Sequence, residues 1–296
     1  MKAIIVSYNN TLNGVVIDAL EHYAYLRSQN ECISLLVVSQ QQGWDVRALF
    51  KKIALGRFGH CDWADDIIII SRPARLLKFS LETALIFGSQ EVLYYPYIKA
   101  EKLIVVKEYV PTMHWYSEAS KWYETLSKVD NVLFFREYEC NDIHAKDLVT
   151  PSLFAFDLYR KVESVPPSHH LISLASKGSV SVIPELLDDP ECEVLITYGA
   201  DVFLKDKRLI TYPKSVGDLF SLFGTYVYNN QNNFVDPRPR LFVECKFYGK
   251  EIKVVGPIGT AGARERYCEY LNTSRDEVIS NRTMTLDKPL IQQFLH

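Results

Sequence analysis

The sequence predicts an α/β protein made of two halves, each with its own parallel sheet. Short, continuously apolar runs alternate with longer segments of helical periodicity, a pattern typical of parallel strands covered on both faces. Two consecutive prolines, Pro166 and Pro167, interrupt this pattern, because they cannot lie inside a helix or a central strand. The alternation starts again after them. We therefore expect two Rossmann-like domains, residues 1–165 and 166–296, that face each other across a cleft.

The first half opens as a strand, a helix and a second strand. Residues 2–7 are apolar and β-branched, and a turn-rich loop follows them. From residue 15 to residue 26 apolar side chains recur at spacings of three and four, which predicts a helix. Other apolar runs predict strands at 32–38, 66–70, 102–106 and 131–135.

The second half repeats the alternation on a smaller scale. Strands are predicted at 169–175, 193–198, 208–212, 225–228 and 251–255, and helices at 179–187, 215–223 and 239–249. In open α/β sheets, ligands bind beyond the carboxyl ends of the strands. We therefore expect the site in the cleft at these ends.

Composition and charge limit the classes of function. The 296 residues are 48% hydrophobic and 23% charged, as in soluble globular proteins. A net charge of −3 disfavours a protein that coats long stretches of nucleic acid. The six cysteines form no CxxC pair, which is typical of a reducing compartment. With no leader or transmembrane run, a soluble, cytoplasmic protein is expected, and contact with a membrane surface stays open.

The stretch from residue 226 to residue 256 carries the most chemical information. It predicts a strand, a long polar loop, a helix that starts with Arg238, Arg240 and Glu244, and a glycine cap at Gly249. The N-terminus of a helix favours a phosphate, because its backbone N–H groups are unpaired and its dipole is positive there. A carboxylate in the same turn can accept hydrogen bonds from a ribose diol.

This stretch resembles the GT-B glycosyltransferases, in particular the retaining family that uses sugar nucleotides and carries a Glu-x7-Glu motif. Asp236-x7-Glu244, followed by Tyr248-Gly249, fits that motif with Asp in place of the first Glu. The resemblance implies that Glu244 holds the ribose hydroxyls and that Asp236 is catalytic, close to the transferred sugar. The segment of Arg238 and Arg240 would then face the diphosphate.

Further matches follow in the order that the family has. Lys177, in Ser176-Lys177-Gly178, is similar to the lysine that neutralises the diphosphate leaving group, although the preceding strand lacks the family's arginine. Gly199 resembles the glycine before the nucleotide-base pocket, and Gly14 the glycine loop that approaches the donor. The resemblance covers residues 169–260, and more loosely 1–40.

Several residues have both a functional and an ordinary interpretation. Asp236 and Glu244 also fit a helix N-cap and a surface charge, and Lys177 and Gly14 fit ordinary loop residues. His114 and Glu108 follow the predicted strand 102–106, where the family often has a sugar-contacting histidine, but His114 also fits a packed edge beside aromatic rings.

The sequence predicts no metal site. Asp62, Asp65 and Asp66 precede a strand, whereas a metal-binding acidic motif would follow one, so we interpret them as loop charges. A metal-independent mechanism is the expectation.

A basic amphipathic segment runs through residues 47–57. Arg47, Lys51, Lys52 and Arg57 alternate there with apolar side chains. A solvated helix face is the first interpretation, and an anionic membrane surface or a nucleic-acid acceptor are the others.

The resemblance predicts a glycosyltransferase that needs no cofactor besides its nucleotide-sugar co-substrate, a UDP-sugar by first expectation. Residues 1–165 would form the acceptor side and residues 166–296 the donor side, with a short C-terminal helix at 287–295 packing back on the first domain. The acceptor would be a glycan or lipid-linked glycan. One alternative is a transferase for a modified base in phage DNA, and another is a degenerate relative that binds a nucleotide or partner without turnover.

Overall fold

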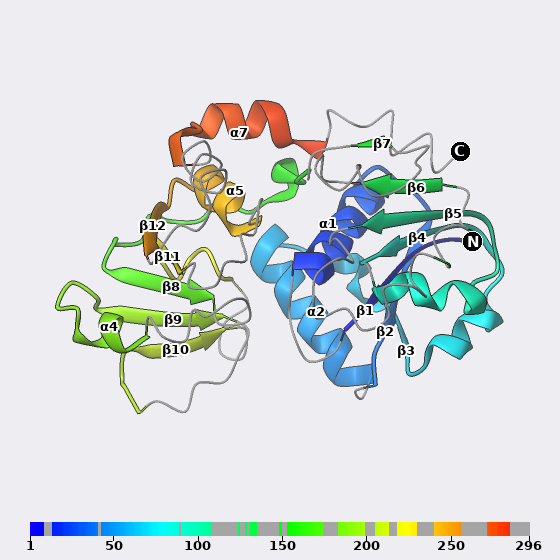
Figure 1. Ribbon diagram of the computed structural model, residues 1–296, viewed down its shortest axis with the longest axis horizontal. Coiled ribbons are helices and arrows are strands. Elements are labelled where there is room, and N and C mark those ends of the chain that lie inside the picture. The colour runs from blue at the N-terminus through cyan, green and yellow to red at the C-terminus, as the bar shows by residue number, and fades with distance from the viewer. Residues whose placement is uncertain are drawn as a thin grey trace. The chain divides into compact units, whose positions relative to one another are not determined.

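A computed structural model gives the structure of the protein. It describes residues 1–8, 14–40, 43–88, 90–107, 124, 128, 131–134, 148–149, 153–173, 183–198, 205–212, 218–229, 240–255 and 271–284. The chain forms two compact units, and each is described by itself (Figure 1). Unit 1 comprises residues 1–51, 61–158 and 282–296, and unit 2 comprises residues 52–60 and 159–281.

Unit 1 is built on a seven-stranded parallel sheet. Its strands follow the order β3-β2-β1-β4-β5-β6-β7, and they are β1 (Lys2–Ser7), β2 (Ile33–Val38), β3 (Ile68–Ile70), β4 (Leu81–Phe87), β5 (Ala100–Lys107), β6 (Asn131–Phe134) and β7 (Leu148–Val149). Four consecutive residues of β1, Ala3 to Val6, have no exposed surface, so both faces of the sheet are covered. Helix α1 (Gly14–Ser28) packs against β1, β2 and β4.

The second helix, α2 (Gly43–Phe58), is divided between the units after Lys51. In the described connections between β2 and β5, unit 1 also has short 3-10 helices: η1 (Asp62–Asp66), η2 (Pro73–Lys78) and η3 (Gln90–Tyr97).

Strand β4 was missing from the sequence prediction, although it pairs with both β1 and β5 near the middle of the sheet. The exposed Glu82 breaks its apolar run. The segments on either side of β4 are 3-10 helices, which have no long 3.6-residue period to mark them. The connection between β3 and β5 is long enough for a helix, which is what the alternation of strands and helices predicts there.

Unit 2 is built on a five-stranded parallel sheet. Its strands follow the order β10-β9-β8-β11-β12, and they are β8 (His169–Ser173), β9 (Val194–Tyr198), β10 (Leu209–Tyr212), β11 (Thr225–Asn229) and β12 (Glu251–Val255). The helices are α4 (Ile183–Asp188), α5 (Arg240–Phe247) and α7 (Arg275–Arg282), of which α7 ends one residue inside unit 1.

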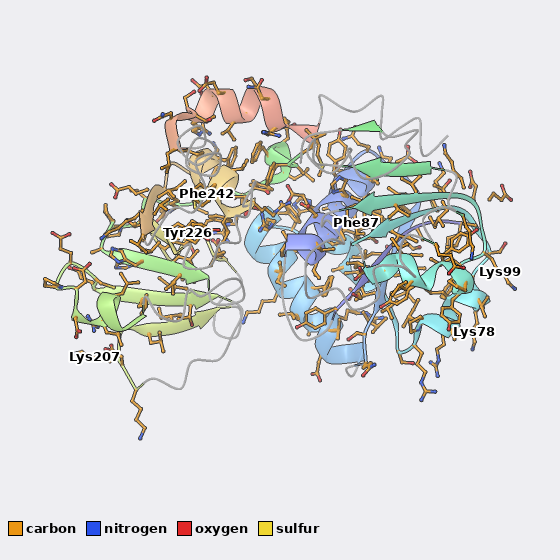
Figure 2. All side chains as sticks on the ribbon, viewed as in Figure 1. Lys78, Phe87, Lys99, Lys207, Tyr226 and Phe242 are labelled. Atoms are coloured by element: carbon orange, nitrogen blue, oxygen red, sulfur yellow. The ribbon has the colours of Figure 1, made fainter. Side chains whose placement is uncertain are left out.

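Aromatic side chains join α5 to the sheet of unit 2. The ring of Phe242 meets the rings of Tyr226 and Tyr228 edge-on, with centroids 5.9 and 5.3 Å apart, and Figure 2 shows Phe242 and Tyr226 beside each other. Gly249 ends the helix with a positive φ of 66°, as the sequence predicts. The α/β fold with two parallel sheets, predicted from the alternating apolar runs, is thus confirmed.

The helix predicted at 215–223 is wrong for its described part. Residues 218–223 form turns. The carboxylate of Asp218 accepts a hydrogen bond from the Ser221 backbone N–H at 3.4 Å, and the Ser221 hydroxyl donates to the Asp218 carbonyl at 3.2 Å. Such local side-chain bonds compete with helical ones.

The two sheets share one topology. Each begins in the middle, adds two strands on one side, and then crosses to the other side. The order reverses between β1 and β4 in unit 1 and between β8 and β11 in unit 2. In doubly wound sheets of this kind, ligands bind at the carboxyl ends of the strands beside that reversal.

The end of the described chain returns to unit 1. Phe154 donates its backbone N–H to the Arg282 carbonyl at 2.8 Å and accepts one from Met284 at 2.9 Å. The C-terminal helix expected at 287–295 lies outside the described residues. Within the described part of the chain, no helix combines the length and apolarity that crossing a bilayer requires.

The double-proline segment packs tightly on the start of β11. The Thr225 hydroxyl donates to the Pro167 carbonyl at 2.8 Å, and the Gly224 N–H donates to the His169 carbonyl at 3.0 Å. A Cβ at Gly224 would overlap the carbonyl oxygens of Val165 and Pro166. Position 224 therefore requires glycine because of this close backbone approach.

We expect Gly224→Ala to lower the free energy of unfolding by about 1–3 kcal/mol, the usual cost of forcing an extra group into a packed site. Urea unfolding measures it. Gly14→Ala is the matched control, because a Cβ there meets nothing within 4 Å and alanine favours a helix. Equal stability of the two variants would contradict the close approach.

Candidate functional site

The reversal point of unit 1 holds a buried carboxylate. Strand β1 ends at Ser7, whose backbone N–H donates to Glu91 Oε1 at 3.3 Å and whose hydroxyl donates to the same atom. Gly88, directly after β4, has a φ of 103°, and a Cβ there would overlap the Glu91 carboxylate. Burial and the charge of Glu91 raise the pKa of Tyr94 to about 12. The geometry thus fixes a hydrogen-bond acceptor where ligands of such sheets bind.

Glu91 was missed by the sequence analysis. Its signal is its position just after a strand, and that strand, β4, was itself missed. Had β4 been recognised, a carboxylate four residues beyond its end would have been a candidate.

Helix α1 places buried polar side chains beside β4. His22 Nδ1 lies 2.8 Å from the Asp18 carbonyl, and its ring centroid lies 5.0 Å from that of Phe87. Glu21 Oε1 accepts a hydrogen bond from the Ala155 backbone N–H at 2.6 Å. Burial lowers the pKa of His22 to about 3, so the ring is neutral near pH 7. His22 is therefore a neutral donor to the carbonyl one turn earlier in its own helix, and its ring packs on Phe87 of β4.

The low pKa of His22 predicts acid sensitivity. Between about pH 3 and 6.5 the unfolded chain binds a proton that the folded protein does not. Stability therefore falls as the pH is lowered below 6.5, by up to about 1.4 kcal/mol per pH unit for this group. We expect His22→Gln to flatten the dependence of urea unfolding on pH between 6.5 and about 4.5, above the main range of carboxyl titration.

His60→Gln is the control for this measurement, because His60 is exposed. It should keep the wild-type slope. A wild-type slope in His22→Gln as well would show that His22 is not the group responsible.

Unit 2 contains a cluster of four polar side chains, of which Arg57, Tyr159 and Glu244 are buried and Arg240 is 12% exposed. Glu244 lies in α5 and is 1% exposed. Its Oε1 accepts hydrogen bonds from the Tyr159 hydroxyl at 3.1 Å, from Arg240 Nε at 3.0 Å and from Arg57 Nη1. Arg240 is four residues before Glu244 on the same helix, so the two share a face.

Segments far apart in the chain supply the cluster. Arg57 comes from the last turn of α2, in the part of that helix that belongs to unit 2, and Tyr159 is the first residue of the second stretch of chain in this unit. The Tyr159 ring stacks on Tyr248 with centroids 5.8 Å apart, and the Arg57 guanidinium lies 5.3 Å from the Tyr159 ring centroid. The aromatic packing and the ion pairs thus hold each other in place.

The cluster pairs one carboxylate with two guanidinium groups. Burial raises the pKa of Glu244, but the charges of Arg57 and Arg240 lower it by more, so the group stays ionised. Burial and the neighbouring carboxylate raise the pKa of Tyr159 well above its ordinary value. The three charged groups therefore carry one net positive charge.

The predicted site residues fall into two groups. Gly14 is the first residue of α1, after β1, while Arg240 and Glu244 lie in α5, after β11. The others lie outside the described residues: Lys177, Gly199, Asp236, Arg238, His114 and Glu108. The roles that the resemblance implies for all of them stay predictions.

Arg47 and Lys51 of the basic segment have partners within unit 1. Arg47 donates to the Ile67 carbonyl at 3.0 Å, and Lys51 pairs with Asp65 at 3.4 Å. Asp66 pairs with Arg27 at 2.9 Å. The solvated-face interpretation is wrong for Arg57, which is buried and pairs with Glu244 in unit 2. Over the residues that the structure describes, no group of three or more acidic, histidine or cysteine side chains is arranged to hold a metal.

We expect Glu244→Ala to lower the free energy of unfolding by about 3–5 kcal/mol, because two guanidinium groups would stay buried without their carboxylate. Urea unfolding at pH 7 measures it. Glu163→Ala, at an exposed position, should change the value by less than about 0.5 kcal/mol. Since the folded pKa of Glu244 is lowered, its contribution is complete above about pH 4.5 and is lost as the pH falls further. A cost similar to that of Glu163→Ala would contradict the pairing.

Comparison with known proteins supports the fold. No family model matches the sequence, and no curated protein is significantly similar to it. The crystal structure of Anabaena Alr3699/HepE in complex with UDP and glucose matches with a TM-score of 0.62 and 10% identity, over 100% of this chain and 99% of that one. A glycosyltransferase from Rickettsia africae ESF-5 matches with a TM-score of 0.52 and 12% identity, over 99% and 97%. At these identities the likeness concerns the fold alone.

Proposed function

We propose that the protein is a glycosyltransferase that moves a sugar from a nucleotide-sugar donor, a UDP-sugar in the first place, to a glycan or lipid-linked glycan acceptor. The observation that carries this proposal is the likeness to HepE, crystallised with UDP and glucose, over the whole length of both chains. The topology supports it, because each unit has a reversal point of the kind at which such sheets bind ligands.

The proposed donor residues follow the strands of unit 2 in sequence. Lys177 comes four residues after the end of β8, Gly199 directly follows β9, and Asp236 and Arg238 come between β11 and α5. Residues that follow parallel strands belong to the carboxyl side of a sheet. We assign to them the donor site of a GT-B enzyme. Gly14 after β1, and Glu108 and His114 after β5, are the corresponding candidates in unit 1.

The mechanism that we propose is charge stabilisation without a metal. As the bond between the sugar and the diphosphate breaks, negative charge grows on the phosphate oxygens. Lys177 and Arg238, with helix N–H groups, would stabilise it, and Asp236 would lie near the sugar. We also propose that the reaction retains the anomeric configuration. This part rests only on the resemblance of Asp236-x7-Glu244 to the motif of the retaining family.

The test is a donor screen with purified protein. UDP-glucose, other UDP-sugars and GDP-mannose are each offered with and without oligosaccharide or lipid-linked acceptors, and release of the nucleoside diphosphate is followed. We expect release from a UDP-sugar that EDTA leaves unchanged. We expect Lys177→Ala to lower kcat by about 10²–10³-fold, as loss of a charge-stabilising group does.

Lys205→Ala is the matched control, because Lys205 is exposed and lies outside the proposed site. It should keep the wild-type rate. Binding of UDP without release or transfer under any condition would favour the degenerate nucleotide-binding alternative, and absence of binding to every donor would refute the proposal.

A further inference from the structure

The Tyr159 hydroxyl lies at the centre of the cluster in unit 2. It donates to Glu244 Oε1 at 3.1 Å and accepts from Arg57 Nη1 at 3.0 Å and from Arg240 Nη2 at 3.1 Å. A hydroxyl has one proton to donate and two lone pairs, so these three bonds use its full capacity. Its raised pKa keeps the proton in place at neutral pH. Tyr159 thus joins all three charged groups.

Arg240 is held from two directions at the start of α5. Its Nε donates to Glu244 and its Nη2 to Tyr159. A free arginine side chain loses rotamer entropy when it is fixed. Because the cluster already fixes Arg240, a ligand that binds this guanidinium need not meet that cost.

Arg57 keeps the cluster cationic. It shares Glu244 Oε1 with Arg240, so the single carboxylate is divided between two guanidinium groups. Its guanidinium also lies 5.3 and 5.7 Å from the ring centroids of Tyr159 and Phe220, which limit its movement. One net positive charge therefore remains next to the helix start that follows β11.

We propose that Tyr159, Glu244 and Arg57 are positioning residues, which hold the Arg240 guanidinium ready for the diphosphate of the donor. The inference rests on the proposed function. The resemblance implies that Glu244 contacts the ribose, whereas here we assign it a different role, in which it orients Arg240. Buried to 1% exposure and bonded to three donors at Oε1, the carboxylate is placed to order the cation.

The test compares UDP with uridine, which differ by the diphosphate. Tyr159→Phe keeps the ring packing and removes only the hydroxyl. We expect calorimetry to show UDP binding weakened about 10-fold, near the value of one charge-assisted hydrogen bond, with uridine binding unchanged within about twofold. Tyr248→Phe is the matched control. Its ring belongs to the same stack, but its hydroxyl donates at 3.4 Å to the Arg160 carbonyl, outside the cluster. It should keep both affinities.

A second variant separates the two parts suggested for Glu244. Glu244→Gln should weaken UDP relative to uridine and keep the wild-type preference for UDP over 2′-deoxy-UDP. Loss of that preference would instead assign Glu244 to the ribose and overturn its positioning part. If Tyr159→Phe does not fold, Glu244→Gln and Arg57→Lys, each as a single variant, are used to compare UDP affinity with uridine affinity.

Two results would overturn the positioning role of Tyr159. The first is that Tyr159→Phe keeps both affinities, and the second is that it lowers both by the same factor. Either result would mean that the hydroxyl only stabilises the structure. If the wild-type protein binds neither UDP nor uridine, a UDP-sugar is not the donor and this inference falls, whereas the proposed function falls only if every donor of the screen also fails to bind.

Discussion

The centre of unit 2 depends on a single carboxylate, that of Glu244. Charges buried in a protein interior are tolerated only when opposite charges and hydrogen bonds surround them. Here one oxygen, Glu244 Oε1, accepts hydrogen bonds from three parts of the chain: Arg57 of α2, Tyr159, and Arg240 of α5. The aromatic stack around Tyr159 and Tyr248 excludes water from these bonds and thereby strengthens them.

The two sheets have the same strand order but differ in what lies at the reversal point. In unit 1, Ser7 and Gly88 make room for the Glu91 carboxylate directly at the strand ends. In unit 2, Arg240 and Glu244 lie in the helix that follows β11, Arg57 and Tyr159 join them from other segments, and the charged groups together carry a net positive charge. An acceptor of hydrogen bonds suits hydroxyl groups, whereas a cationic helix start suits phosphate. Under the proposed function, unit 1 would thus offer acceptors to sugar hydroxyls and unit 2 cations to the diphosphate.

Much of the fold could be predicted from the sequence, because buried parallel strands are continuous apolar runs. Strand β4 could not, since Glu82 interrupts it, and the turn at Asp218 was mistaken for a helix because its hydrogen bonds come from side chains. Of the four residues in the cluster, only Arg240 and Glu244 could be predicted as a site from the sequence. The spacing of Arg240 and Glu244 is local, but Arg57 contacts Glu244 from 187 positions away, and its own neighbourhood is that of an ordinary basic helix. No local pattern marks Tyr159.

The close approach of Gly224 to the double-proline segment has an evolutionary consequence. Any side chain at position 224 would collide with the backbone carbonyls of Val165 and Pro166, so neither segment can change on its own. A relative that replaces this glycine must therefore also carry the backbone of residues 165–166 along a different path, whatever side chains stand there, and its unit 2 would begin differently.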